Sequence, residues 1–86
     1  MEIVEEIIDD IVIEIINAER ATLKESSNLK NMIYEKIDKG YKNVIIDLSK
    51  VDFIDSTFLG VIVNALKKVA GLGGDLKLVG FKPAVR

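Results

Sequence analysis

One carboxylate and two hydroxyls stand in a row near the middle of the chain, at Asp55, Ser56 and Thr57. Side chains of these types can cap a helix, act as a nucleophile or accept a phosphoryl group. A strand-like segment precedes them and an apolar helical pattern follows, so they lie where a helix begins. Capping requires one of the three, and the others are candidates for chemistry or recognition.

The residue inventory argues against catalysis by this group. The chain contains no His and no Cys, which removes the commonest general base, the commonest metal ligand and any thiolate nucleophile. No Lys stands at motif spacing from Ser56, and the segment is not a Gly-x-Ser-x-Gly elbow. The sequence therefore predicts no enzyme, no cofactor and no metal site.

A regulated hydroxyl is the other interpretation of Ser56. Phosphorylation would add a charge of roughly −1.5 to −2 at pH 7, and a helix N-terminus tolerates negative charge well. Asp52 and Asp55 are close in sequence. A partner packed at this corner would then face repulsion and a desolvation cost. A phosphate here would abolish binding without unfolding the domain.

The composition indicates a small domain without a polyanion-binding surface. The 86 residues include 12 basic and 14 acidic side chains, with a net charge of −2 and no basic block. This balance argues against nucleic-acid binding. The apolar runs are far shorter than the roughly 20 residues of a membrane span, and the N-terminus is acidic and unlike a signal peptide. These features predict a soluble, cytoplasmic domain.

The elements before the corner are predicted to be a hairpin and a helix. Residues 2–16 are dominated by β-branched side chains and predict two strands turning at Asp9-Asp10, with a single helix as the alternative. Residues 28–39 have helical periodicity, with Ser26 or Ser27 as the cap and Gly40 just past the end.

The elements after this helix predict an α/β fold. Residues 44–46 are apolar on both faces, as in a strand in the middle of a covered sheet. A helix over 57–70 and a strand from Leu76 complete a β-β-α-β-α-β order with parallel crossovers. The only Pro, Pro83, suits the first turn of a further helix, but no helix follows. The chain is thus predicted to be a truncated fragment or a domain that has lost its final helix.

The predicted helix over 57–70 has two apolar faces. Leu59, Ile62, Val63, Leu66, Val69 and Ala70 follow the spacing of a core face. The opposite face begins beside Ser56 and is unusually apolar for solvent, which marks a partner site. The alternative is that another element covers Phe58 and Val61. The predicted partner-binding residues are Asp55, Ser56, Thr57, Phe58, Val61, Asn64 and Lys68.

Four short motifs resemble those of the anti-sigma factor antagonist (STAS) family. They are Asp47-Leu48-Ser49 after a strand, residues 55–60 at a helix start, Gly73-Gly74 before a strand, and Pro83-Ala84-Val85. About half of the chain matches closely. The resemblance implies a small mixed β-sheet with helices mainly on one side. It also implies one STAS-like domain over 1–86 that lacks the family's C-terminal strand and helices.

The resemblance also implies a non-enzymatic role in transcription control. Family antagonists bind an anti-sigma factor, often a serine kinase, and so free a sigma factor. The kinase phosphorylates the Ser after the motif Asp, which is Ser56 here, and a serine phosphatase reverses the reaction. Thr57 is the alternative acceptor, and ATP belongs to the kinase, so this chain needs no cofactor.

Two residues depart from the family pattern. Phe58 replaces the usual Gly and puts bulk where a kinase would approach Ser56, and Arg20 stands about where an acidic residue is expected. Both departures favour an alternative function. In that alternative the chain is a non-switching STAS module that assembles with other STAS domains or forms part of a larger sensor or transporter.

Overall fold

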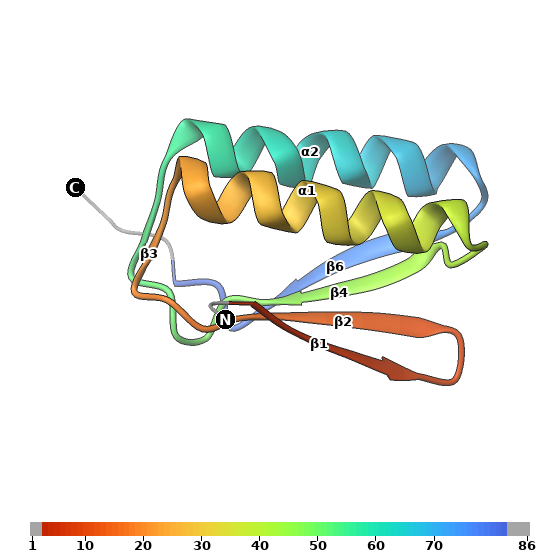
Figure 1. Ribbon diagram of the computed structural model, residues 1–86, viewed down its shortest axis with the longest axis horizontal. Coiled ribbons are helices and arrows are strands. Elements are labelled where there is room, and N and C mark those ends of the chain that lie inside the picture. Colours follow the sequence, from red (N-terminus) through yellow and green to blue (C-terminus); the bar gives the residue numbers. More distant parts are fainter. Residues whose placement is uncertain (1–2, 83–86) are drawn as a thin grey trace.

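A computed structural model of the chain describes residues 3–82, and in it two helices pack on one face of a mixed four-stranded sheet (Figure 1). The strand order is β1-β2-β4-β6, and a separate two-stranded ladder joins β3 to β5. The predicted α/β class with helices on one side is confirmed. The elements are β1 (Ile3–Ile8), β2 (Ile11–Ile16), β3 (Arg20–Ala21), α1 (Leu23–Asp38), β4 (Asn43–Asp47), β5 (Phe53–Ile54), α2 (Ser56–Gly71) and β6 (Asp75–Val79).

The N-terminal segment forms the predicted hairpin. β1 and β2 pair antiparallel, with Ile8 opposite Ile11 across the turn at Asp9-Asp10. Asp9 has a φ of +56°, in the left-handed region that Asp adopts more readily than most residues. The alternative of one helix over residues 2–16 is therefore wrong for the described part of that segment.

The rest of the sheet is parallel, and each crossover contains a helix. β4 pairs parallel with β2 and with β6, so α1 and α2 connect strands on the same face. Val44 and Ile46 are buried under the helices, whereas Ile45 is half-buried on the other face. The pattern of residues 44–46 predicts a sheet covered on both faces, but within residues 3–82 no helix covers the face of Ile45.

Helix α1 begins at Leu23, five residues before its predicted start. Thr22 is the N-cap, and its N–H and hydroxyl lie 3.0 and 3.1 Å from Glu25 Oε1 in a capping box. Ser26, a predicted cap, is instead buried inside the helix and donates its hydroxyl to the Leu23 carbonyl at 2.7 Å. The helix ends at Asp38, and Gly40 follows with a φ of +99°, as its position predicts.

A cluster of ionisable side chains lies between the hairpin and α1. Glu5 and Glu14 are directly opposite each other in the hairpin, and Lys36 Nζ of α1 lies 2.8 Å from Glu5 Oε1. Glu14 is fully buried. Burial, together with the neighbouring carboxyl group of Glu5, raises the pKa of Glu14 from 4.5 to about 9. Glu14 is therefore protonated at neutral pH, which avoids a second buried negative charge beside Glu5.

Candidate functional site

The corner before α2 is fixed by the small ladder between β3 and β5. Arg20 and Ala21 pair in parallel with Phe53 and Ile54, and the Asp55 N–H donates to the Ala21 carbonyl at 3.1 Å. The Arg20 guanidinium lies 4.3 Å from the centroid of the Phe53 ring, within cation–π distance. These contacts tie the start of α2 to the segment that leads into α1.

The turn after β4 is held by the motif Asp47-Leu48-Ser49. The Ser49 N–H donates to Asp47 Oδ1 at 2.9 Å, and this bond lowers the pKa of the Asp47 carboxyl. The Leu48 N–H donates to the Val79 carbonyl at 2.8 Å. Gly80 packs so closely that a Cβ there would lie 2.6 Å from Ser49 Cβ. These three motif residues therefore shape the backbone that leads into the corner.

Asp55 supplies the helix cap at this corner. Its Oδ1 accepts a hydrogen bond from the Phe58 N–H at 2.9 Å, and its backbone is extended, as an N-cap requires. Ser56 is the first residue of α2, and both Ser56 and Thr57 are exposed. The first turn of α2 contains no acidic side chain. The corner thus presents two exposed hydroxyls at a helix N-terminus that is capped by the Asp55 carboxylate.

Phe58 is part of the core, so its predicted place on an exposed partner face is wrong and the alternative holds. Its side chain is fully buried, together with Ile62, Ala65 and Val69 of α2. These residues are spaced i, i+4, i+7 and i+11 and form one face. Val61 is half-buried against the same core. Because Phe58 points inward, its bulk does not stand over Ser56.

The exposed apolar side of α2 consists of residues that the sequence predicts to be in the core. Leu59, Val63 and Leu66 are 49%, 41% and 39% exposed. Together with Ser56 they are spaced i, i+3, i+7 and i+10, so they follow one side of the helix from its first residue. We call Ser56, Leu59, Val63 and Leu66 the α2 stripe. The sequence could not separate the two faces because both are apolar.

The other predicted partner-binding residues lie on the side of α2 next to α1. Lys68 Nζ is 5.9 Å from the centroid of the Tyr34 ring of α1. Thr57 and Asn64 are exposed, as is Lys68. These side chains are available to a partner, but they lie about half a turn around the helix from Leu59 and Leu66. The corner therefore has a polar flank toward α1 and an apolar flank away from it.

Comparison with known protein families matches residues 3–86 to the STAS domain. The chain belongs to the STAS domain family. Its resemblance to this family is thereby confirmed, although the motif Pro83-Ala84-Val85 lies outside the described residues.

Several proteins and solved structures are similar to this STAS domain. It is 39% identical over 74 residues to "Putative anti-sigma factor antagonist TM1081 homolog" of Thermotoga neapolitana, and equally so to the corresponding Thermotoga maritima protein. These matches cover 85% of this chain but 65% of each relative, so the chain spans just under two thirds of their length.

The structural matches agree with this assignment. The crystal structure of the Thermotoga maritima protein has a TM-score of 0.80 and 33% identity, covering 96% of this chain and 71% of that one. The anti-sigma factor antagonist SpoIIAA in its unphosphorylated form has a TM-score of 0.84 over 94% of this chain and 74% of its own. Its 16% identity supports the fold alone.

Neither helix of the described residues could cross a membrane. Each has 16 residues, fewer than the roughly 20 that a bilayer span needs.

Proposed function

We propose that this STAS domain is an anti-sigma factor antagonist whose binding is switched by phosphorylation of Ser56. In this role it sequesters an anti-sigma factor that is also a serine kinase, and so regulates sigma-factor-dependent transcription in the cytoplasm. The observation that carries the proposal is that the helix cap and the exposed hydroxyl at the corner belong to two different residues. Asp55 makes the cap, which leaves Ser56 exposed at the head of an apolar stripe.

The α2 stripe is the proposed docking surface. Leu59, Val63 and Leu66 expose between 39% and 49% of their area. A partner that covered them would remove apolar surface from water, which stabilises a complex by about 25 cal/mol per Å² buried. Thr57, Asn64 and Lys68 would form the polar rim on the α1 side. Similarity to proteins named as anti-sigma factor antagonists supports this class of partner.

A phosphoryl group on Ser56 would act through charge. It would lie at the N-terminus of a 16-residue helix whose first turn contains no acidic side chain, so α2 would remain folded. A partner seated over Leu59 would instead have to desolvate a doubly charged group beside Asp55. Binding would therefore be lost while the fold is kept. A serine phosphatase would restore the binding state, and Thr57 is the alternative acceptor.

Mass spectrometry of the protein from its native cells tests this proposal. Peptides that contain Ser56 should carry a phosphoryl group in some growth or stress conditions, and fragmentation distinguishes Ser56 from Thr57. The absence of phosphate on both residues in every condition would contradict the switch.

A second candidate is a non-switching STAS module that assembles with other STAS domains in a larger sensor or transporter. The face of the sheet that no helix of the described residues covers favours this candidate, because each of the four strands places at least one partly exposed apolar side chain on it. The two candidates differ in Ser56: a non-switching module would use it as an ordinary surface residue and would lose nothing in Ser56→Asp.

A further inference from the structure

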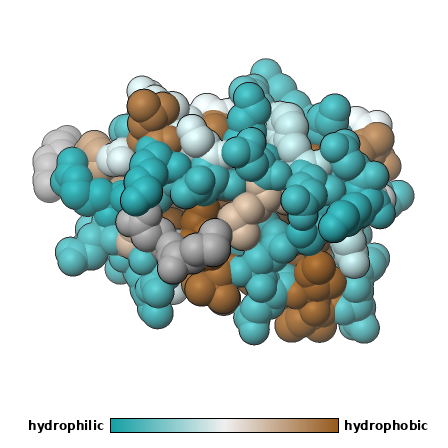
Figure 2. Space-filling view, in the orientation of Figure 1, coloured by the Kyte–Doolittle hydropathy of each residue, from teal (hydrophilic) through white to brown (hydrophobic). Residues whose placement is uncertain are grey.

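The sheet has one face that no helix of the described residues covers. Side chains alternate along each strand, so this face collects every second residue of β1, β2, β4 and β6. Ile8, Val4 and Val79 on it are 55%, 44% and 43% exposed. Figure 2 shows hydrophobic surface at the lower right, over the hairpin end. The open face consists of Val4, Glu6, Ile8, Ile11, Ile13, Ile15, Asn43, Ile45, Asp47, Asp75, Lys77 and Val79.

The strand register aligns these residues in rows across the sheet. The central row runs Glu6, Ile13, Ile45, Lys77, because each residue pairs with the next across adjacent strands. Its two middle members are half-buried isoleucines, and its ends are exposed groups of opposite charge on β1 and β6. Three strand spacings of about 4.8 Å separate the ends. Both ends of this row therefore carry a charge, and the two charges have opposite signs.

We propose that the open face binds a second copy of this chain, sheet against sheet, about a two-fold axis that runs parallel to the strands between β2 and β4. This axis reverses the row, so Ile13 faces Ile45 of the second copy and Glu6 faces its Lys77. The contact is isologous, and each charge pair therefore occurs twice. A two-fold axis perpendicular to the strands and along this row would place Glu6 against Glu6 and Lys77 against Lys77, so the charges of this row favour the first arrangement.

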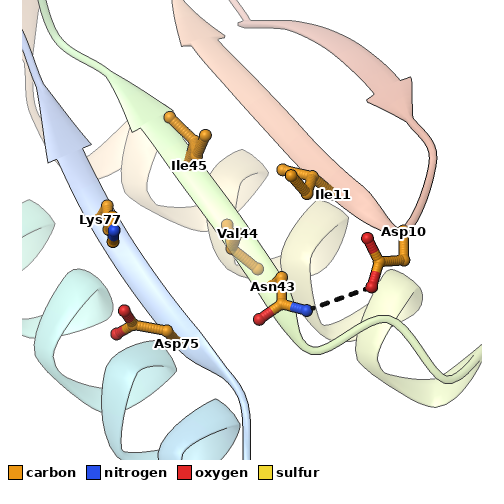
Figure 3. A pocket seen from close by; sticks show the side chains of 7 residues that line it. All are labelled: Asp10, Ile11, Asn43, Val44, Ile45, Asp75 and Lys77. Atoms are coloured by element: carbon orange, nitrogen blue, oxygen red, sulfur yellow. Dashed lines mark hydrogen bonds between the residues drawn. The ribbon is translucent and has the colours of Figure 1, made fainter.

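A hollow at one end of the open face fits the same arrangement. It has a volume of about 280 Å³ and is lined by side chains of β2, β4 and β6 together with Asp10. Figure 3 shows Ile11, Ile45 and Lys77 around it, in front of the helices. The proposed two-fold axis brings Ile8 of the second copy over this end, above Asp75. An exposed isoleucine thus enters a hollow with isoleucines in its wall.

Two polar side chains at the hollow, those of Asn43 and Asp75, have hydrogen-bond partners within the chain. Asn43 Nδ2 donates to Asp10 Oδ2 at 3.4 Å, and Asp75 Oδ1 accepts from the Leu76 N–H at 2.8 Å. Covering such groups costs less than covering unpaired ones. These two bonds lower the cost of covering Asn43 and Asp75.

The size of the face indicates a weak dimer. Four strands of about five residues span roughly 19 by 17 Å. The area of such a face is well below the ~800 Å² per partner that a typical stable interface buries. Two such sheets would pack about 10 Å apart with their strands at about −30°. We expect a dissociation constant between about 10 µM and 1 mM. This inference rests on the sheet and is independent of the Ser56 switch.

Sedimentation velocity of the chain at concentrations from about 5 µM to about 1 mM tests the proposal. The wild type should pass from monomer to dimer with increasing concentration. Glu6→Lys and Lys77→Glu should each weaken dimerisation about tenfold or more, and the double variant should recover most of the loss because it restores both pairs. Leu66→Lys, on the other side of the molecule, is the matched control and should dimerise like the wild type.

Three results would overturn the proposal. The wild type could remain monomeric at the highest concentration, the double variant could stay as weak as the single ones, or a dimer could persist unchanged in both single variants. The thiol of an Ile45→Cys variant provides an independent readout. It should react with a thiol reagent at low concentration and be protected at high concentration. Protection at every concentration would mean that another part of the chain, and not a second copy, covers the face.

Discussion

The Asp55 carboxylate accepts a hydrogen bond from the Phe58 amide at 2.9 Å, and this bond, not one from Ser56, caps helix α2. The residue before the proposed phosphoacceptor therefore does the structural work of the corner. The acceptor can then be modified or replaced without removing the cap. This separation of roles determines how variants at the two positions should differ.

Variants of Asp55 and Ser56 should have different effects on stability. Asp55→Ala removes the cap and should lower the free energy of unfolding by about 1 kcal/mol. Ser56→Ala changes an exposed hydroxyl and should stay within about 0.5 kcal/mol of the wild type. Urea unfolding followed by circular dichroism measures both. A larger loss of stability in Ser56→Ala than in Asp55→Ala would contradict the assignment of the cap to Asp55.

Charge at Ser56 should control partner binding. Ser56→Ala should bind the anti-sigma factor constitutively, whereas Ser56→Asp should bind at least about tenfold more weakly, because the added carboxylate must be desolvated beside Asp55. Calorimetry or surface plasmon resonance with the purified partner measures this difference. Thr57→Asp is the matched control on the polar flank and should have a smaller effect. Equal affinities of Ser56→Ala and Ser56→Asp would contradict the switch.

Two neighbouring apolar residues of α2 should behave oppositely. Phe58→Ala empties a fully buried site and should cost about 3–5 kcal/mol of stability. Leu59→Ala, at a side chain that is 49% exposed, should cost less than about 1 kcal/mol but weaken partner binding. Thermal unfolding and a binding assay on the same samples distinguish them. Phe58→Leu keeps most of the buried volume and provides a folded comparison if Phe58→Ala does not fold.

The protonated Glu14 should give the domain an unusual pH dependence. Its pKa is raised from 4.5 to about 9 in the folded state, so between these values the folded protein holds a proton that the unfolded chain has released. Its contribution to stability is complete below about pH 4.5 and is lost as pH rises through about 9. The loss amounts to at most about 1.4 kcal/mol per pH unit for one proton.

Glu14→Gln should remove this dependence because the amide stays neutral. Urea unfolding from pH 5.5 to 9, above the range in which exposed carboxylates titrate, measures the slope in both proteins. Glu6→Gln, at an exposed glutamate of the same hairpin, is the control and should keep the wild-type slope. Parallel slopes for the wild type and Glu14→Gln would show that Glu14 is ionised in the folded state.

The sequence predicted the elements that have a strong local signal. The β-branched run before and after Asp9-Asp10 gave the hairpin, and the parallel crossovers followed from the order of strands and helices. The early start of α1 was missed, although the capping box from Thr22 to Glu25 signals it. The segment is polar, and it contains little of the apolar periodicity by which a helix is usually recognised.

The faces of α2 could not be predicted from its sequence. Phe58 and Ile62 form one apolar row, and Leu59 and Val63 form another. Periodicity alone does not decide which row faces the sheet, because the choice depends on where α1 and the strands lie. The pairing of half-buried Glu5 with buried Glu14 was missed for a similar reason. Each looks like a surface charge until the hairpin register brings them together.

The ladder between β3 and β5 makes the corner less strongly paired than the main sheet. It joins two residues to two others across more than thirty positions of the chain, whereas the main sheet pairs five or six residues at each contact. Local opening of a structure requires the loss of the contacts at that place alone. The bond between the Asp55 N–H and the Ala21 carbonyl should therefore open at a lower free energy than the pairings of the main sheet, while Phe58 holds the first turn of α2 in the core. An enzyme that modifies Ser56 would meet a substrate that opens at its own corner and does not have to unfold.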